Sequence, residues 1–199
     1  MCNVGSTIAG TTSVSYGNYF QWGRSNAPFP STGNVPTIAW PKTLTEANNA
    51  TGSFITSVAF STHDWLTPQD NNRLWGWGTD QITGTYADRT PTNQALMQWP
   101  CAYWYHVPTA KEWCDTVNSL AGTPICSNYT NVNLWYILKI PAAGMRYIDW
   151  WLSSPTYAML ASSSPSSDRT WTIEYHYTWV FNYGIDPNNF WVNVRCQKN

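Results

Sequence analysis

The chain has 199 residues, a length that suits one domain with a substantial buried core. Its 10 lysine and arginine residues almost balance its 11 acidic residues, and this balance excludes a polybasic nucleic-acid-binding protein. Aromatic residues make up 16% of the chain, whereas charged residues make up only 11%. We therefore expect some of the aromatic rings to serve in binding instead of in the core.

The sequence shows no targeting or membrane-spanning segment. The longest uncharged stretches, Leu120–Leu138 and Trp150–Ser167, are interrupted by Asn, Ser and Pro, so neither is expected to cross a bilayer. Residues 1–6 lack the basic and apolar regions of a signal peptide. We expect no direct insertion of this chain into a membrane.

The five cysteines show no spacing typical of a zinc site, and we expect neither a metal nor a cofactor. An odd number leaves at least one cysteine outside any disulfide within the chain. Cys114 with Cys126, and Cys101 with Cys196, are candidate pairs, but spacing alone does not fix the connectivity.

In chain order, the first expected elements are short. The aromatic segment Tyr16–Arg24 indicates an early strand, and Leu44–Ala50 indicates one or two helical turns. Two compact segments rich in Pro, Gly and Asn, Thr67–Asn72 and Trp75–Gly78, are typical of ordered loops.

The clearest helix signal is a capping box. Thr109 is placed to cap the first turn, and Glu112 to accept a hydrogen bond from the amide of Thr109. The helix is expected to run to about Leu120, with Trp113, Val117 and Leu120 on one buried face.

The C-terminal part is expected to be rich in strands. Leu134–Ile140 indicates a buried strand, and the low-complexity segment Ser162–Ser167 indicates a polar turn. Trp171–Phe181 alternates large apolar with mostly polar residues, as a half-buried strand does. Residues 184–189 are expected to form a loop, and Phe190–Cys196 the closing strand.

No catalytic motif is present. His63, His106 and His176 lie in no nucleophile or metal motif, and the pair His63-Asp64 is typical of a local turn. We therefore expect no enzymatic activity. Paired carboxylates of the glycosidase type meet only in three dimensions, so that alternative stays open.

The last third of the chain carries an unusual density of rings. Residues 147–191 hold twelve aromatic residues against five charged ones. The core is expected to take Ile173, Tyr175, Val180, Phe190, Val192 and Val194. Because a strand pair in a small domain is expected to bury one face, a second group should form an exposed, paratope-like cluster: Trp171, Glu174, His176, Trp179, Tyr183 and Trp191.

Several segments together resemble one family. In order they are Tyr19–Arg24, Trp99–Cys101 followed by Tyr105–Trp113, Leu138–Arg146, Ser162–Pro165 and Val194–Cys196. This series resembles the Fibrobacter succinogenes major paralogous domain, a family that looks like a branch of the C-type lectin fold related to formylglycine-generating-enzyme-like domains. The resemblance implies an α+β fold of the C-type lectin type, with a small twisted antiparallel sheet, one or two helices and extensive ordered loops.

Members of this group serve as variable proteins of diversity-generating retroelements. The resemblance implies a single domain, residues 1–199, with a fixed scaffold over about 1–146 and a variable region over about 147–193. Adenine-directed mutagenesis rewrites such a region. The ligand-contacting candidates are the positions where related domains tend to carry Asn, Gly or Ser and this chain carries other or unusual residues: Tyr147, Trp150, Tyr157, Met159, Arg169, Trp171, Glu174, His176, Trp179, Tyr183, Ile185, Asn188, Trp191 and Asn193.

The chain also departs from the family pattern. Ala161 stands where a Trp usually precedes the serine run, and Tyr103-Trp104 replaces a more usual Pro/Gly turn after Cys101. The triplets of calcium-dependent sugar-binding lectins and the C-terminal cysteine pair of formylglycine-generating enzymes are missing. Calcium-dependent sugar binding and catalysis are therefore not expected.

The function implied by the resemblance is that of a receptor or adhesin of a bacterium, an archaeon or a virus. It would bind a protein or glycan ligand, with no nucleic-acid partner, at a cell surface, as a secreted protein or on a virion. One alternative is a fixed carbohydrate-binding surface domain. A second is an enzyme of the formylglycine-generating-like class, which predicts a deep pocket with perturbed titratable groups in place of a broad aromatic surface.

Overall fold

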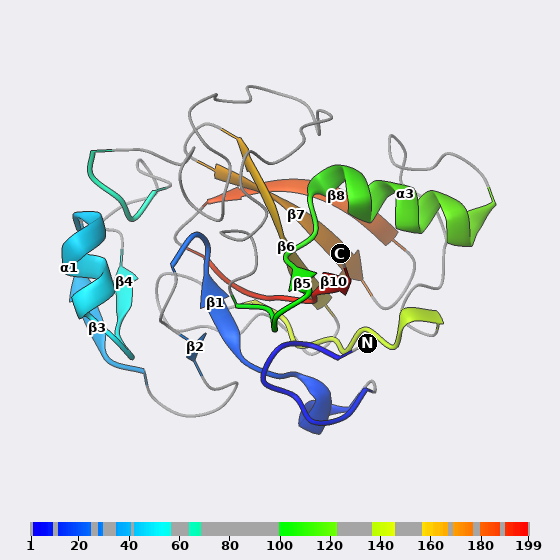
Figure 1. Ribbon diagram of the computed structural model, residues 1–199, viewed down its shortest axis with the longest axis horizontal. Helices are drawn as coiled ribbons and strands as arrows, with labels where there is room; N and C mark the ends of the chain where they lie inside the picture. Colours follow the sequence, from blue (N-terminus) through cyan, green and yellow to red (C-terminus); the bar gives the residue numbers. More distant parts are fainter. Residues whose placement is uncertain are drawn as a thin grey trace.

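The computed structural model describes residues 2–9, 12–24, 28–29, 35–40, 42–56, 64–68, 100–122, 137–145, 157–166, 169–176, 180–187 and 190–198. These residues form an α+β structure (Figure 1). Its helices are α1 (Leu44–Asn49) and α3 (Ala110–Ala121), with a 3-10 turn at Ser13–Ser15. Its strands are β1 (Tyr19–Gln21), β2 (Pro28–Phe29), β3 (Thr37–Ala39), β4 (Phe54–Thr56), β5 (Tyr105–His106), β6 (Tyr157–Ser166), β7 (Arg169–His176), β8 (Val180–Pro187), β9 (Trp191–Asn193) and β10 (Gln197–Lys198).

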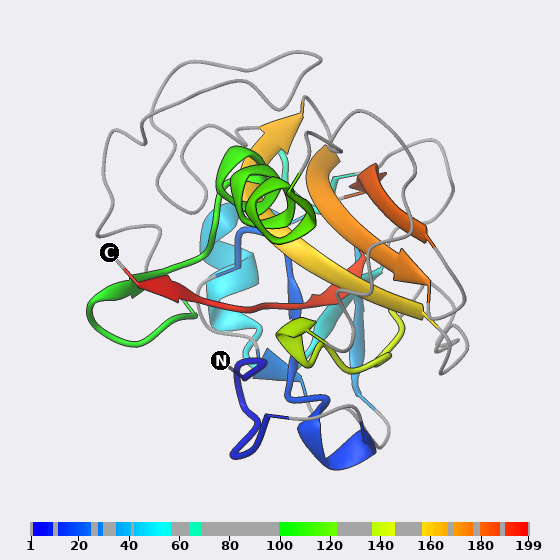
Figure 2. The ribbon, with the colours of Figure 1, turned by 90° about the vertical axis from the view of Figure 1, so that its right-hand side faces the viewer.

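The main sheet joins the two ends of the chain. Its strand order is β2-β1-β9-β6-β7-β8, so the N-terminal strand β1 lies beside the C-terminal strand β9, antiparallel, with Phe20 opposite Val192. The strands β6, β7 and β8 form an antiparallel meander that makes up one side of the sheet. Figure 2 shows α3 lying across the meander and β9 running beside β6. Two smaller sheets pair β3 with β4 and β5 with β10.

Helix α3 confirms the capping box. The Thr109 hydroxyl accepts from the Glu112 amide (3.0 Å), and the Glu112 carboxylate accepts from the Thr109 amide (2.8 Å). The helix ends at Gly122, whose left-handed φ of 69° closes the last turn without the strain of a Cβ. Trp113 and Val117 are buried as expected. Leu120 was predicted to be buried but is exposed, because the apolar stripe continues through the partly buried Ala121.

The short N-terminal elements are confirmed. Strand β1 lies within the aromatic segment, and α1 covers the expected helical turns. A second capping box opens α1: the Thr43 amide donates to the Glu46 carboxylate (2.8 Å), and the Thr43 hydroxyl accepts from the Glu46 amide (3.2 Å). The expected loop at Thr67 is described only for Thr67 and Pro68, and Trp75–Gly78 lies outside the described residues.

The serine run does not form the polar turn that its composition predicted. Ser162–Ser166 lie in β6, and Ser167 lies outside the described residues. Ser162, Ser163 and Ser164 are buried at a bulge between Ala161 and Pro165. Small hydroxyl side chains fit there because they bond to the backbone: the Ser162 hydroxyl donates to the Trp171 carbonyl (2.6 Å). The buried serines therefore stabilise the β-sheet and do not form a loop.

The last strands are divided differently from the prediction. The alternating segment from Trp171 to Phe181 is not one strand, because β7 ends at His176 and the antiparallel β8 begins at Val180. The loop predicted for residues 184–189 is also wrong as far as Pro187, which still belongs to β8. Upstream, Ile137 and Leu138 lie in a helical turn and not in the predicted strand. The closing strand is confirmed by β9.

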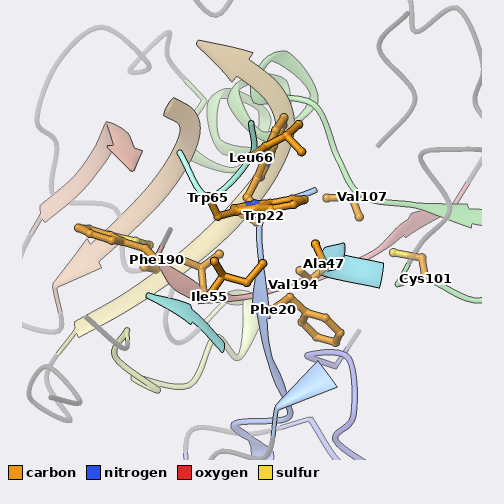
Figure 3. Close-up of a cluster of buried hydrophobic side chains, with 13 residues drawn as sticks. Phe20, Trp22, Ala47, Ile55, Trp65, Leu66, Cys101, Val107, Phe190 and Val194 are labelled. Carbon is orange, nitrogen blue, oxygen red and sulfur yellow. The ribbon is translucent and has the colours of Figure 1, made fainter. Parts of the chain in front are cut away.

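Two apolar clusters cover opposite faces of β6. Met159 and Ala161 belong to the central core, which also contains Phe20, Trp22, Ile55, Trp65, Leu66, Phe190, Val192 and Val194 (Figure 3). Ala158 and Leu160 belong to the helix-side core, with Trp113, Val117, Ile140, Ile173 and Tyr175. The predicted core positions Ile173, Tyr175, Phe190, Val192 and Val194 are thus confirmed, whereas the side chain of Val180 lies outside the described residues.

One disulfide ties the middle of the chain to its end. Cys101 and Cys196 are bonded, with their Cα atoms 5.7 Å apart, as one of the candidate pairs predicted. Cys114 is also disulfide-bonded, Cys126 lies outside the described residues, and Cys2 is a free thiol.

Within the described part of the chain, the helices are too short or too polar to span a membrane.

Candidate ligand-binding face

The predicted contact residues centre on the meander β6–β7–β8. In this meander Glu174 lies opposite Met159 on one side and Asn182 on the other, and Thr172 lies opposite Ala161 and Gly184. Directly opposed residues share one face of a sheet, and successive residues alternate between faces. One face of β7 therefore carries Trp171, Ile173 and Tyr175, and the other carries Thr170, Thr172 and Glu174.

Four predicted contact residues are buried, which corrects the expectation that they face a ligand. Met159, Trp171, Trp191 and Asn193 are 1%, 7%, 3% and 1% exposed. Trp191 stacks on Phe29 at 4.3 Å between ring centroids and meets Phe54 edge-on at 4.5 Å. The Asn193 side-chain amide donates to the carbonyls of Tyr16 (3.0 Å) and Asn18 (3.1 Å).

The physical reason is the position of these strands in the sheet. The prediction assumed that a strand pair buries only one face, but β6, β7 and β9 lie inside a six-stranded sheet. The central core covers one face of β6 and the helix-side core covers the other. Large residues of both alternating sets are therefore buried.

Four other predicted residues have accessible side chains. Tyr157, Arg169 and Glu174 are partly exposed, and Ile185 is 37% exposed. The Arg169 guanidinium donates to the Ile185 carbonyl across the β7–β8 pair (3.3 Å). The meander thus keeps an accessible group of aromatic, cationic, anionic and apolar character.

The remaining predicted residues are only partly placed. His176 lies at the end of β7, opposite Tyr157 and Val180, and Tyr183 lies in β8 opposite Ile173; their side chains are outside the described residues. Tyr147, Trp150, Trp179 and Asn188 also lie outside the described residues.

A polar cluster of Tyr157, Thr172, Glu174 and Asp186 occupies the meander. The Thr172 hydroxyl donates to the Asp186 carboxylate, and Glu174 shares hydrogen bonds with both Tyr157 and Asp186. Gly184 lies at the centre, where a Cβ would be 2.6 Å from Asp186 Oδ2 and 2.7 Å from Thr172 Oγ1, so these side chains would have to shift to admit any larger residue. Sequence reasoning missed Thr172, Gly184 and Asp186, since no local signal fixed the register of β8 on β7.

Burial sets the protonation of this cluster. It raises the pKa of the Asp186 carboxyl, although hydrogen bonds with Thr172 and Glu174 and the charge of Arg169 act in the opposite direction. Burial, with the nearby carboxylates of Glu174 and Asp186, also raises the pKa of the Tyr157 hydroxyl. Glu174 and Asp186 are thus a pair of carboxyl groups that the fold brings together in the meander.

The raised pKa of Asp186 predicts a pH-dependent loss of stability. An acid whose pKa is raised on folding binds more protons in the folded state, so stability falls as the pH rises from the ordinary value through the raised one. Asp186→Asn keeps an acceptor for Thr172 and carries no charge. We expect a higher midpoint of thermal unfolding than in the native chain at pH 7, and a smaller difference at about pH 3, below the ordinary pKa of an aspartate.

Thermal unfolding followed by circular dichroism across this pH range measures the effect. Asp115→Asn, on the exposed side of α3, is the matched control for loss of one acid. Equal pH profiles for native chain and Asp186→Asn would contradict the assignment.

Comparison with protein-family models, with curated proteins and with solved structures gave no match. In the residues that the structure describes, no group of three or more His, Cys, Asp or Glu side chains is arranged to hold a metal ion.

Proposed function

We propose that this chain is a ligand-binding variable protein, a receptor or adhesin of C-type-lectin-like fold diversified by a retroelement. The meander β6–β8 and the segments that flank it would form the ligand-contacting face, for a protein or glycan. Disulfides persist mainly in oxidising surroundings, so the Cys101–Cys196 bond supports a place at a cell surface, in secretion or on a virion.

The observation that carries this proposal is that the segments behind the family resemblance bind one another. They are far apart in sequence but form one connected network. Its hydrogen bonds are Trp22 Nε1 to Ser162 O (2.9 Å), Ala110 N to Ser164 Oγ (3.0 Å), Ser163 N to Pro108 O (2.8 Å), Arg195 Nη1 to Leu138 O (2.7 Å) and Tyr19 Oη to Ala143 O. The Cys101–Cys196 disulfide joins two of these segments covalently.

Most residues of the network are buried. From Tyr19 to Arg24 every residue is buried, as are Ser162–Pro165, Val194 and Arg195. Such residues cannot change without loss of packing or of a buried hydrogen bond. This is the property required of a scaffold that stays fixed while other positions vary.

By contrast, the accessible side chains of the meander can vary without loss of the strand pairing. The backbone between them is held by buried serine and threonine side chains, such as the Thr170 hydroxyl donating to the Ser164 carbonyl (3.2 Å). Arg169, Glu174 and Ile185 project from this backbone with exposed surface. Substitution there changes the surface while the strand pairing remains.

This division predicts unequal tolerance to substitution. The triple variant Arg169→Ala, Glu174→Gln, Ile185→Ala is expected to lose less than about 1.5 kcal/mol of unfolding free energy. Glutamine keeps hydrogen-bonding groups for the polar cluster, and accessible sites change stability by about 0.5 kcal/mol each. Trp191→Ala, the buried comparison on β9, is expected to lose about 3 to 5 kcal/mol. Denaturant unfolding measures both, and a triple variant as unstable as Trp191→Ala would contradict the proposed display surface.

The DNA flanking the gene tests the diversification directly. We expect a near-copy of the segment coding residues 147–193 that differs mainly where the copy carries adenine, together with a reverse-transcriptase gene. A complete locus without such a copy would refute diversification and leave a fixed glycan- or protein-binding surface domain.

A further inference from the structure

A turn of exposed aromatic residues lies outside the proposed variable region. It comprises Ala102–Tyr105 and is called here the aromatic turn. Tyr103 is 69% exposed, Trp104 63% and Tyr105 37%. The first two rings meet edge to face, with centroids 4.8 Å apart and planes at 65°. Two large rings held together in solvent form an apolar surface that folding of the described chain does not use.

The backbone of the aromatic turn is strained at its tryptophan. Trp104 has a φ of 69°, in the left-handed region, and the Tyr105 amide donates to the Ala102 carbonyl (2.9 Å) to close the turn. A turn with positive φ at its third position favours glycine, and a bulky side chain there carries an energetic cost. Exposure and strain both disfavour Trp104, which makes it a candidate for a contact outside the chain.

The aromatic turn is also held rigidly. It follows Cys101 directly, and the Cys101–Cys196 disulfide and the β5–β10 pairing fix both of its sides. Figure 2 shows the β5–β10 pair projecting from the body of the molecule, with the C-terminal strand beside the turn. A rigid mount lowers the entropy that the rings lose on binding.

We propose that the aromatic turn is a second, fixed binding site that stacks on a pyranose ring of a glycan. The face of an aromatic ring is electron-rich, and one face of a pyranose presents C–H groups to it. Tyr103 and Trp104 also carry a hydroxyl and an indole N–H that can donate to sugar hydroxyls. The site is independent of the diversification proposed for β6–β8.

The small area of the aromatic turn favours a sugar ligand over a protein or a membrane. A stable protein interface needs about 800 Å² from each partner, far more than two or three side chains supply. Even a myristoyl chain binds membranes only weakly, and two rings at a tip bury less apolar area. Two aromatic rings can stack on one or two sugar rings. Avidity would strengthen such a contact if many copies of the protein lay on one surface.

Trp104→Gly provides the test, because it removes the ring and supplies the residue that the turn favours. We expect the full native chain, immobilised on beads in many copies, to bind a subset of oligosaccharides on a glycan array. Titration of the strongest oligosaccharide should show binding at least about tenfold weaker for Trp104→Gly and for Tyr103→Ala, about 1.4 kcal/mol. The unfolding midpoint of Trp104→Gly should equal or exceed that of the native chain.

A control separates this site from other exposed apolar side chains. Val14→Ala removes an apolar side chain that is 66% exposed elsewhere, and it should keep glycan binding. No bound oligosaccharide on the array, or equal binding by Trp104→Gly, would overturn the proposal. So would a large loss of stability in Trp104→Gly, or Trp104-dependent binding to phosphatidylcholine and phosphatidylserine vesicles without glycan binding.

Discussion

Replacing both Cys101 and Cys196 with alanine is expected to lower the free energy of unfolding by about 4 to 5 kcal/mol. The bond closes a loop over a sequence separation of 95 residues, and the entropy that a disulfide removes from the unfolded chain grows with the length of this loop. For a chain of this size, 1 kcal/mol corresponds to about 2 to 4 °C, so the unfolding midpoint should fall by about 8 to 20 °C. Alanine suits Cys101, which is buried in the central core.

Thermal and denaturant unfolding of the double variant, without reductant, measure this loss. Cys2→Ala is the matched control, because Cys2 is a free thiol and its removal should leave the midpoint almost unchanged. A double variant as stable as Cys2→Ala would mean that the network of hydrogen bonds alone holds the C-terminus in place. The β5–β10 pairing involves only two residues on each strand, so the aromatic turn should also lose order in the double variant.

Local signals in the sequence predicted local structure well. The capping box at Thr109 and Glu112 fixes the start of α3 through contacts within four residues. The alternation around Ile173 and Tyr175 places these side chains on one face of a strand, and both are buried. In each case the deciding interaction lies within a short window of the chain.

The elements that sequence reasoning missed depend on partners far away. The serine run resembles a turn by composition, but partners outside the run, among them the carbonyls of Pro108 and Trp171 and the amide of Ala110, make it part of a buried strand. The alternation of residues 171–181 continues through the chain reversal between β7 and β8, so it carries no sign of that reversal. A period of two residues identifies a strand but not its end.

The candidate ligand-binding face was also predicted only in part, because the burial of its residues depends on neighbouring strands far away in the sequence. Met159, Trp171, Trp191 and Asn193 were expected to be accessible because one face of a strand pair was taken to meet solvent, but the neighbours of β6, β7 and β9 in the sheet could not be read from the sequence. Arg169, Glu174 and Ile185 retain accessible surface. Asp186 joins Glu174 only through the register of β8 on β7.

Trp22→Ala is the second change with a large expected effect, a loss of at least about 4 kcal/mol. Trp22 is fully buried in the central core, where truncating a tryptophan costs about 3 to 5 kcal/mol. Its indole N–H also donates to the Ser162 carbonyl (2.9 Å), and this hydrogen bond is lost with the ring. Figure 3 shows Trp22 beside Trp65, whose Nε1 donates to the backbone carbonyl of Trp22 (2.7 Å). The Trp22 ring, directly after β1, is thus bonded to β6, the first strand of the meander.

Two further variants isolate the cause of this loss. Trp22→Phe keeps most of the volume but not the hydrogen bond, and we expect it to lose about 1 to 3 kcal/mol. Trp104→Ala removes the same side chain from an exposed position and should change stability by about 0.5 kcal/mol or less. Urea unfolding of the three proteins gives the comparison. If Trp22→Ala were no less stable than Trp104→Ala, the link between β1 and β6 would not hold the fixed scaffold, and the proposed division between scaffold and display surface would lose its physical basis.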